Sequence, residues 1–94
     1  MVYIDKFGNV ALSTRRPLPR GAEVEVVGGR GYVWRAVAGR TFSDVDEGKM
    51  VVYENSFGFL EIAVNKGSAA EMLKVRPGDT LALRVRKPVR RVRR

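Results

Sequence analysis

The segment DKFGN, residues 5–9, places a carboxylate, an aromatic ring and an amide within five residues. An amide can pair with a purine edge through one donor and one acceptor, and an aromatic ring can stack on a base. Asp5, Phe7 and Asn9 are therefore candidates for binding a nucleoside. The same residue types also form Asx-type turns between strands, and their spacing alone favours the turn.

A second group of polar residues flanks the strand expected over residues 59–64. On one side, NSFG offers Asn55, the Ser56 hydroxyl and turn amides that could hold a carboxylate. On the other side, Asn65 ends the strand and Ser68 begins a helix, whose first amides favour anions. Each segment also suits a plain connection, a hairpin turn in the first case and a strand-to-helix link in the second. Composition does not separate these interpretations.

The absence of cysteine and histidine excludes several kinds of chemistry. Disulfides, thiol nucleophiles, zinc sites of the usual ligand types and a Ser-His-Asp triad all require those residues. The segment TFSDVDEG holds Asp44, Asp46 and Glu47, which are too few ligands for a calcium loop. It is predicted to be an acidic, solvated loop in which Phe42 plugs the end of a barrel or lines a pocket. We expect no metal site and no cofactor.

Short apolar runs separated by turn signals predict strands that position these residues. The predicted strands cover residues 2–4, 10–13, 22–27, 32–37, 50–54, 59–64 and 80–85. In the sixth, Leu60, Ile62 and Val64 alternate with outward-facing residues. Ser68 and Glu71 form a capping box that begins one short helix. The pattern predicts an all-β fold, a small closed or nearly closed barrel of six to seven strands with one short helix.

The net charge of +8 is concentrated at the C-terminus. The last eleven residues, RVRKPVRRVRR, contain seven basic residues and no acidic ones. We expect one domain over residues 1–85 and a basic tail over 86–94. Such a tail usually aids solubility, but it can also contact nucleic acid. The candidate contacts are Arg86, Lys87, Arg90, Arg91, Arg93 and Arg94.

The sequence contains no stretch of the roughly 20 apolar residues that a membrane span needs, and it starts without a signal-peptide pattern. We therefore expect a cytoplasmic protein without membrane contact. The absence of glutamine and the 30% of charged residues are typical of a thermophile.

Four segments taken in order resemble a known family. YIDKFGNV, GRTFSDVDEG, NSFGFLEIAVNKGSAAEML and VRPGD look like the C-terminal domain of the S-adenosyl-L-methionine hydroxide adenosyltransferases, whose family includes the fluorinase and the chlorinase. The resemblance covers about residues 2–83. It implies a β-barrel that assembles as part of a trimer. It also implies that S-adenosylmethionine binds where an N-terminal α/β domain meets the C-terminal domain of a neighbouring subunit. Hydrolases of this family release adenosine and methionine.

The resemblance also implies roles for individual residues. Asp5 would meet the methionyl ammonium, Asn9 would pair with the adenine edge, and Ser56, beside Asn55, would hold the methionyl carboxylate. The remaining members of the implied ligand-binding set wall or read the adenine, and they are Phe7, Phe42, Val64, Asn65 and Lys66.

The sequence departs from the family pattern in three places. Phe57 and Val64 stand where the halogenases have arginines, which fits the hydrolase branch. The N-terminal domain, which would supply an activating Asp-Arg-His set, has no counterpart in these 94 residues. We therefore expect a non-catalytic half-site, completed by a separate N-terminal domain.

Two alternative functions remain open at this point. One is a freestanding module that binds a nucleoside or S-adenosylmethionine by itself. The other is a small basic barrel that binds nucleic acid through its arginine-rich tail, and its affinity would fall steeply with salt.

Overall fold

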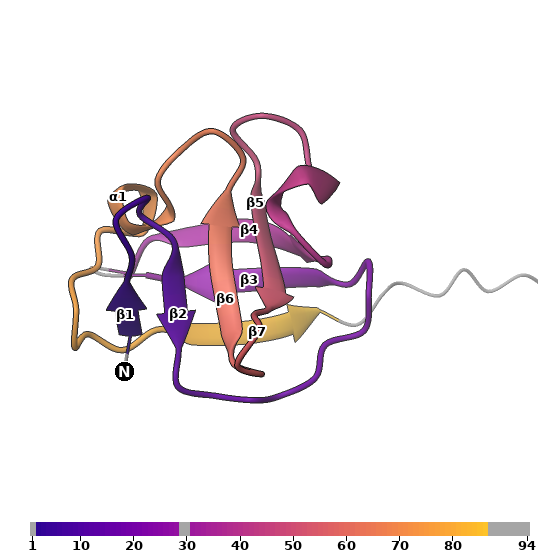
Figure 1. Ribbon diagram of the computed structural model, residues 1–94, viewed down its shortest axis with the longest axis horizontal. Helices are drawn as coiled ribbons and strands as arrows, with labels where there is room; N and C mark the ends of the chain where they lie inside the picture. The colour runs from indigo at the N-terminus through magenta and orange to yellow at the C-terminus, as the bar shows by residue number, and fades with distance from the viewer. Residues whose placement is uncertain (1, 29–30, 87–94) are drawn as a thin grey trace, which may run out of the picture.

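The computed structural model describes residues 2–28 and 31–86. Within this part of the chain, seven strands form one curled sheet with the order β1-β2-β6-β5-β4-β3-β7 (Figure 1). The strands are β1 (Val2–Ile4), β2 (Val10–Leu12), β3 (Glu23–Val27), β4 (Val33–Ala38), β5 (Met50–Glu54), β6 (Leu60–Val64) and β7 (Ala82–Arg86). A 3-10 turn, η2 (Phe42–Asp44), and one helix, α1 (Ala69–Leu73), complete the elements. The predicted fold class is confirmed.

The observed boundaries differ from the predicted ones by one or two residues. Strand β1 and strand β5 are as predicted, whereas β4 is shifted by one residue to end at Ala38. Strand β7 begins later than predicted and runs through Arg86, because Glu23 of β3 pairs with that residue. The acidic loop contains η2, which the sequence analysis did not anticipate.

The sheet is curled into a nearly closed barrel. All neighbouring strands are antiparallel except β4 and β5, which are parallel and are joined by the crossover that contains η2. The end strands β1 and β7 do not pair with each other in the described structure. Instead, the Val2 amide donates to Asp79 O (2.9 Å), and the Gly78 amide donates to Val2 O (3.0 Å). The turn before β7 therefore closes one end of the gap between the end strands.

The core lies on the concave side of the curled sheet. On β6, Leu60, Ile62 and Val64 face this core, as the predicted alternation requires, and Glu61 faces outward. Ile62 and Leu73 are the largest fully buried side chains, and burying each one stabilises the fold by about 1.5–3 kcal/mol. None of the helices in the described ranges is long and apolar enough to cross a membrane.

The outer side of the sheet is partly covered as well. Val51 and Ala63 are buried although neither belongs to the core cluster. The segment after β4 lies over Val51, because a Cβ added at Gly39 would sit 3.2 Å from a Val51 methyl group. The outer surfaces of β5 and β6 are therefore shielded at one end and open around Tyr53 and Glu61.

Candidate functional site

The segment DKFGN forms a tight turn between β1 and β2. The Asp5 carboxylate accepts from the amides of Phe7 (2.8 Å) and Asn9 (3.0 Å), and the Gly8 amide donates to Asp5 O (3.0 Å). Asn9 Nδ2 also donates to Asp5 Oδ2 (3.1 Å). The expected Asx-type turn is therefore present, and it brings the predicted site residues Asp5 and Asn9 into direct contact.

The turn leaves part of each polar group available. A carboxylate has about four lone-pair positions, and the three contacts to Asp5 leave one of them on Oδ2. Asn9 retains one amide hydrogen and its carbonyl oxygen, which is the donor and acceptor pair that an adenine edge requires. Phe7 presents its ring to solvent, with 69% of its surface exposed. The turn therefore offers an open lone pair on Asp5, a donor and an acceptor on Asn9, and an exposed ring on Phe7.

Helix α1 supports this turn from behind. The Ala70 amide donates to Gly8 O (2.9 Å), and the φ angle of Gly8 is +86°. A Cβ at Gly8 would overlap the Ser68 hydroxyl. Ser68 itself caps the helix by accepting from the Glu71 amide (3.2 Å), as the sequence predicted. Only glycine allows this approach, because any other side chain would meet both the positive φ and the serine.

The segment NSFG repeats the same turn between β5 and β6. Asn55 Oδ1 accepts from the amides of Phe57 (3.0 Å) and Phe59 (3.1 Å), and the Gly58 amide donates to Asn55 O (2.9 Å). Gly58 has a φ angle of +88°. The Ser56 hydroxyl is exposed and makes no hydrogen bond among the described residues, so it is available to a ligand.

A carboxylate on the outer face of β6 holds the second turn. Glu61 accepts from Asn55 Nδ2 (3.1 Å) and from the Tyr53 hydroxyl (2.9 Å). Burial, the hydrogen bond to Glu61 and the nearby negative charges of Glu61 and Asp5 raise the pKa of Tyr53 well above its ordinary value. Tyr53 therefore remains a neutral donor throughout the physiological range.

The residues at the far end of β6 are tied to the loop that carries Phe42. Asn65 Nδ2 donates to Val45 O (2.8 Å), and Lys66 Nζ lies 3.1 Å from Glu47 Oε2. Val64 is buried, so only its backbone could contact a ligand. Phe42 is 50% exposed and does not plug the barrel.

The carboxylate of Asp44 shapes the start of the same loop. It accepts from the Arg40 amide (2.7 Å) and the Thr41 amide (3.4 Å). These backbone bonds, the Arg40 one foremost, lower the pKa of Asp44, and the charges of Arg40 and Arg20 act in the same direction. Asp44 thus has a local structural role.

The predicted residues form three groups around one part of the sheet. The first turn lies at the end of β1, the second at the start of β6, and residues 64–66 lie at the end of β6 with the Phe42 loop (Figure 1). The two ends of β6 therefore lie at opposite ends of the candidate site. Each group carries an exposed aromatic ring, Phe7 in the first turn, Phe57 in the second and Phe42 in the loop.

Tyr53 and Glu61 belong to the candidate site although no sequence pattern predicted them there. Glu61 was assigned correctly to the outer face of its strand, but its two partners come from β5 and from the turn. The register that pairs Tyr53 with Glu61 brings them together. The available signal was Glu61 itself, a charged residue in the middle of an otherwise apolar strand.

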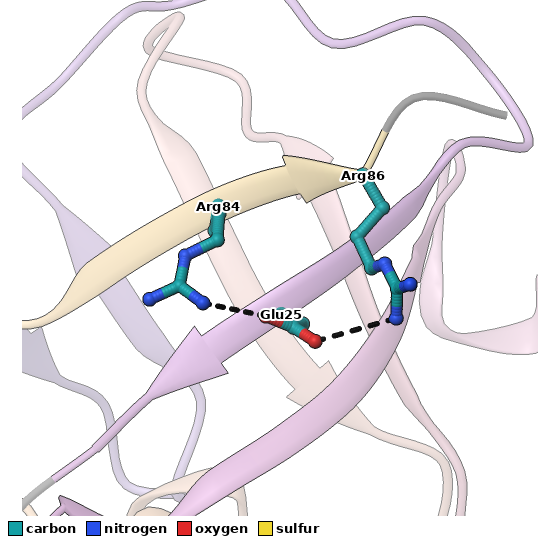
Figure 2. Close-up of polar contacts among 3 residues, drawn as sticks. All are labelled: Glu25, Arg84 and Arg86. Atoms are coloured by element: carbon teal, nitrogen blue, oxygen red, sulfur yellow. Dashed lines mark hydrogen bonds and ion pairs between the residues drawn. The ribbon is translucent and has the colours of Figure 1, made fainter.

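Arg86, a predicted nucleic-acid contact, lies in β7 beside an acidic residue (Figure 2). Glu25 Oε1 accepts from Arg84 (3.0 Å) and Oε2 accepts from Arg86 (3.4 Å). Part of the positive charge of both arginines is therefore compensated. The other predicted contacts, Lys87, Arg90, Arg91, Arg93 and Arg94, lie outside the described residues. Among the residues that are described, no cluster of three or more potential metal ligands is present.

Comparison with known proteins identifies the family. The family model of the SAM hydroxide adenosyltransferase C-terminal domain matches residues 1–82. The chain therefore belongs to this family of C-terminal domains, and the resemblance seen in the sequence is confirmed.

Two curated relatives are named (R)-S-adenosyl-L-methionine hydrolase. The one from Thermus thermophilus is 49% identical over 83 residues, which is 88% of this chain and 30% of the relative. The one from Salinispora tropica is 43% identical over 85 residues, which is 86% of this chain and 30% of the relative. The chain thus spans about a third of the length of these relatives.

Solved structures share the fold. A conserved protein of unknown function from Thermotoga maritima matches with a TM-score of 0.80 at 36% identity, over 86% of this chain and 33% of that one. A conserved hypothetical protein from Thermus thermophilus matches with a TM-score of 0.68 at 43% identity, over 87% of this chain and 32% of that one.

Proposed function

We propose that this chain supplies the adenine- and methionine-binding residues of an S-adenosylmethionine hydrolase site, and that a separate N-terminal domain completes the site. The chain binds and orients the substrate, and the catalytic groups come from the partner. The observation that carries this proposal is that the first turn presents unused hydrogen-bonding positions on both Asp5 and Asn9, beside an exposed Phe7 ring.

The chemistry of the three groups fits the parts of this substrate. The remaining positions on Asn9 complement adenine, and the backbone of residues 64–66 can read the same base. The Ser56 hydroxyl and the amides of its turn suit a carboxylate, and the open lone pair on Asp5 suits an ammonium. A ligand lying along the outer face of β6 would reach both ends of the site.

The exposed aromatic residues support a covering partner. Phe7 and Phe57 are 69% and 75% exposed, although each projects from a tightly bonded turn. Exposed rings grouped around polar positions are typical of a surface that another protein covers. An N-terminal domain from a neighbouring subunit would bury them and would exclude water from the ligand.

The proposal is tested by calorimetric titration with S-adenosylmethionine in two arms. In the first, the ligand is added to this chain alone. In the second, it is added to this chain mixed with the part of the Thermus thermophilus hydrolase that this chain does not match, and release of adenosine and methionine is measured. We expect weak or no binding in the first arm, and binding with product release in the second.

Two variants test the assigned roles in the second arm. Ser56→Ala and Asn9→Ala should each weaken binding about tenfold, because each removes a hydrogen bond to a charged group or a base. Thr80→Ala is the matched control, since Thr80 is exposed in the segment before β7 and belongs to none of the three groups of the candidate site. Unchanged affinity in both variants would contradict the proposal. Tight binding by the chain alone would instead favour the freestanding module.

A further inference from the structure

The outward edge of β7 is unpaired in the described structure. All five residues of β7 pair with β3 on one side, and β7 is the last strand of the sheet. No backbone hydrogen bond joins residues 82–86 to any other described segment. At the opposite end of the sheet, β1 is held by the turn that contains Gly78 and Asp79. The edge of β7 therefore keeps backbone donors and acceptors that can pair with an added strand.

A hollow with an aliphatic floor lies beside this edge. It has a volume of about 510 Å³ and is lined by residues of β7, of the end of β2 and of the segment that follows β2. The floor is made by five leucines, Leu12, Leu18, Leu60, Leu81 and Leu83. A second hollow of about 490 Å³ shares Leu18 and Leu60 with the first one, so the groove continues past them. Val85 remains 36% exposed although Val24, its partner on β3, is fully buried.

Arginine side chains line both sides of this groove. Arg16 lines both hollows, and Arg84 lines the first one from the β7 side. The side chain of Arg84 is 69% exposed although it contacts Glu25 (Figure 2). The lining of the first hollow includes no acidic residue. The seam groove, defined by the residues of the first hollow, is thus apolar at its floor and basic at its sides, whereas the second hollow that continues it also includes Tyr53 and Glu54.

We propose that the seam groove binds an extended acidic peptide, which adds to β7 as a further strand. Successive side chains of a strand point to opposite faces. In an added strand, the residues on the core side would contact Leu83 and the other leucines. The residues on the outer side would lie next to Arg84 and Arg86. The peptide that fits best therefore alternates aliphatic and acidic residues, and its backbone supplies most of the affinity.

The same features disfavour other occupants. Single-stranded nucleic acid binds by stacking bases on aromatic rings, and the lining of the first hollow includes no aromatic residue. A second copy of this chain that paired through β7 would bring Arg84 and Arg86 of both copies together. Like charges on paired strands are destabilising.

The test is fluorescence anisotropy of a labelled peptide that alternates Leu and Glu, titrated with the full chain. We expect saturable binding that weakens as the salt concentration rises, and no saturable binding of the corresponding Leu and Lys peptide. Arg16→Glu should weaken binding about tenfold. Arg76→Glu is the matched control, because it changes the net charge equally but lies outside both hollows. Equal loss in the two variants would overturn the proposal.

Two further probes test the strand addition itself. The peptide is N-methylated at alternate residues in both frames, which blocks one edge or the other. At least one frame should lose binding, and unchanged binding of both would overturn the proposal. An oligothymidylate of equal charge serves as the second probe. If it binds as tightly as the peptide and is weakened equally by Arg16→Glu, the groove is a nucleic-acid site instead.

Discussion

The two turns DKFG and NSFG share one local structure but differ in what holds them. In both, an Asx side chain accepts from the second and fourth following amides, and a glycine with positive φ closes the turn. The first turn is held by backbone contact with α1, through Gly8 and Ala70. The second is held by a side chain, since Glu61 accepts from Asn55.

This difference shows that the same local motif can be positioned in two ways. Backbone packing leaves the polar groups of the first turn partly unused, so Asp5 and Asn9 can meet a ligand. In the second turn, both the amide nitrogen and the amide oxygen of Asn55 make hydrogen bonds within the protein. The exposed Ser56 hydroxyl is the group that remains available for binding. The candidate binding residues are therefore Asp5 and Asn9 in the first turn and Ser56 in the second.

Substitution of the turn glycines should give the largest difference in stability between the two turns. Gly8→Ala should destabilise the fold by about 2–4 kcal/mol, because it combines a left-handed backbone with a steric overlap at Ser68. Gly58→Ala should cost only about 1–2 kcal/mol, because the nearest atom to its Cβ is the flexible end of Arg15. Urea denaturation of both variants measures the free energy of unfolding. Equal losses would show that α1 does not hold the first turn.

The substitutions Asn55→Asp and Asp5→Asn should also differ in their effect on stability, but by less than the two glycine substitutions. Asn55→Asp should destabilise the fold by about 2 kcal/mol near neutral pH, because it places a second carboxylate against Glu61. Asp5→Asn retains an acceptor for the two amides and should cost about 1 kcal/mol or less.

The pH dependence of the unfolding free energy tests whether charge repulsion from Glu61 causes the stability loss in Asn55→Asp. In Asn55→Asp, the repulsion should disappear as the pH falls toward about 4, where one of the two carboxyl groups takes up a proton. The stability gap between this variant and the unsubstituted chain should therefore narrow in acid when measured by urea denaturation. A gap that is constant with pH would mean that repulsion from Glu61 is not its cause.

A small effect is also expected for the phenol that shares Glu61. Tyr53→Phe should reduce stability by about 0.5–1.5 kcal/mol at neutral pH through loss of one hydrogen bond. The pKa of Tyr53 is raised in the folded state, so its contribution is complete below the ordinary tyrosine pKa of 10.0 and is lost as the pH rises above that value. The difference between Tyr53→Phe and the unsubstituted chain should narrow in alkali. A difference that widens there would contradict the assigned cause.

Local patterns were sufficient to predict the seven strands, the helix α1 and the two turns, but not η2. The alternation of Leu60, Ile62 and Val64 placed β6 correctly because one face of a half-buried strand must be apolar. Ser68 and Glu71 located α1, and Asn55 with Gly58 located the second turn, because these preferences act within a few residues. The end of β7 was less accurate, since pairing with β3 decides it.

The candidate site was predicted only in part from local patterns. Asp5 and Asn9 lie within one turn, so their contact follows from local chemistry. The role of Glu61 could not be predicted in the same way, because Tyr53 and Asn55 reach it through the register of two strands. The raised pKa of Tyr53 also depends on burial, which no local pattern sets.

The sequence by itself determined that this protein is a small all-β domain with an Asx turn at DKFGN, a hairpin turn at NSFG and one short helix. Strand alternation, capping and turn preferences are short-range properties, and they need no knowledge of the fold. The tertiary structure alone decided which turn rests on α1, which rests on Glu61, and that an edge of β7 stays open between two arginines. These features depend on strand order and on the incomplete closure of the sheet, which bring together residues that are far apart in the chain.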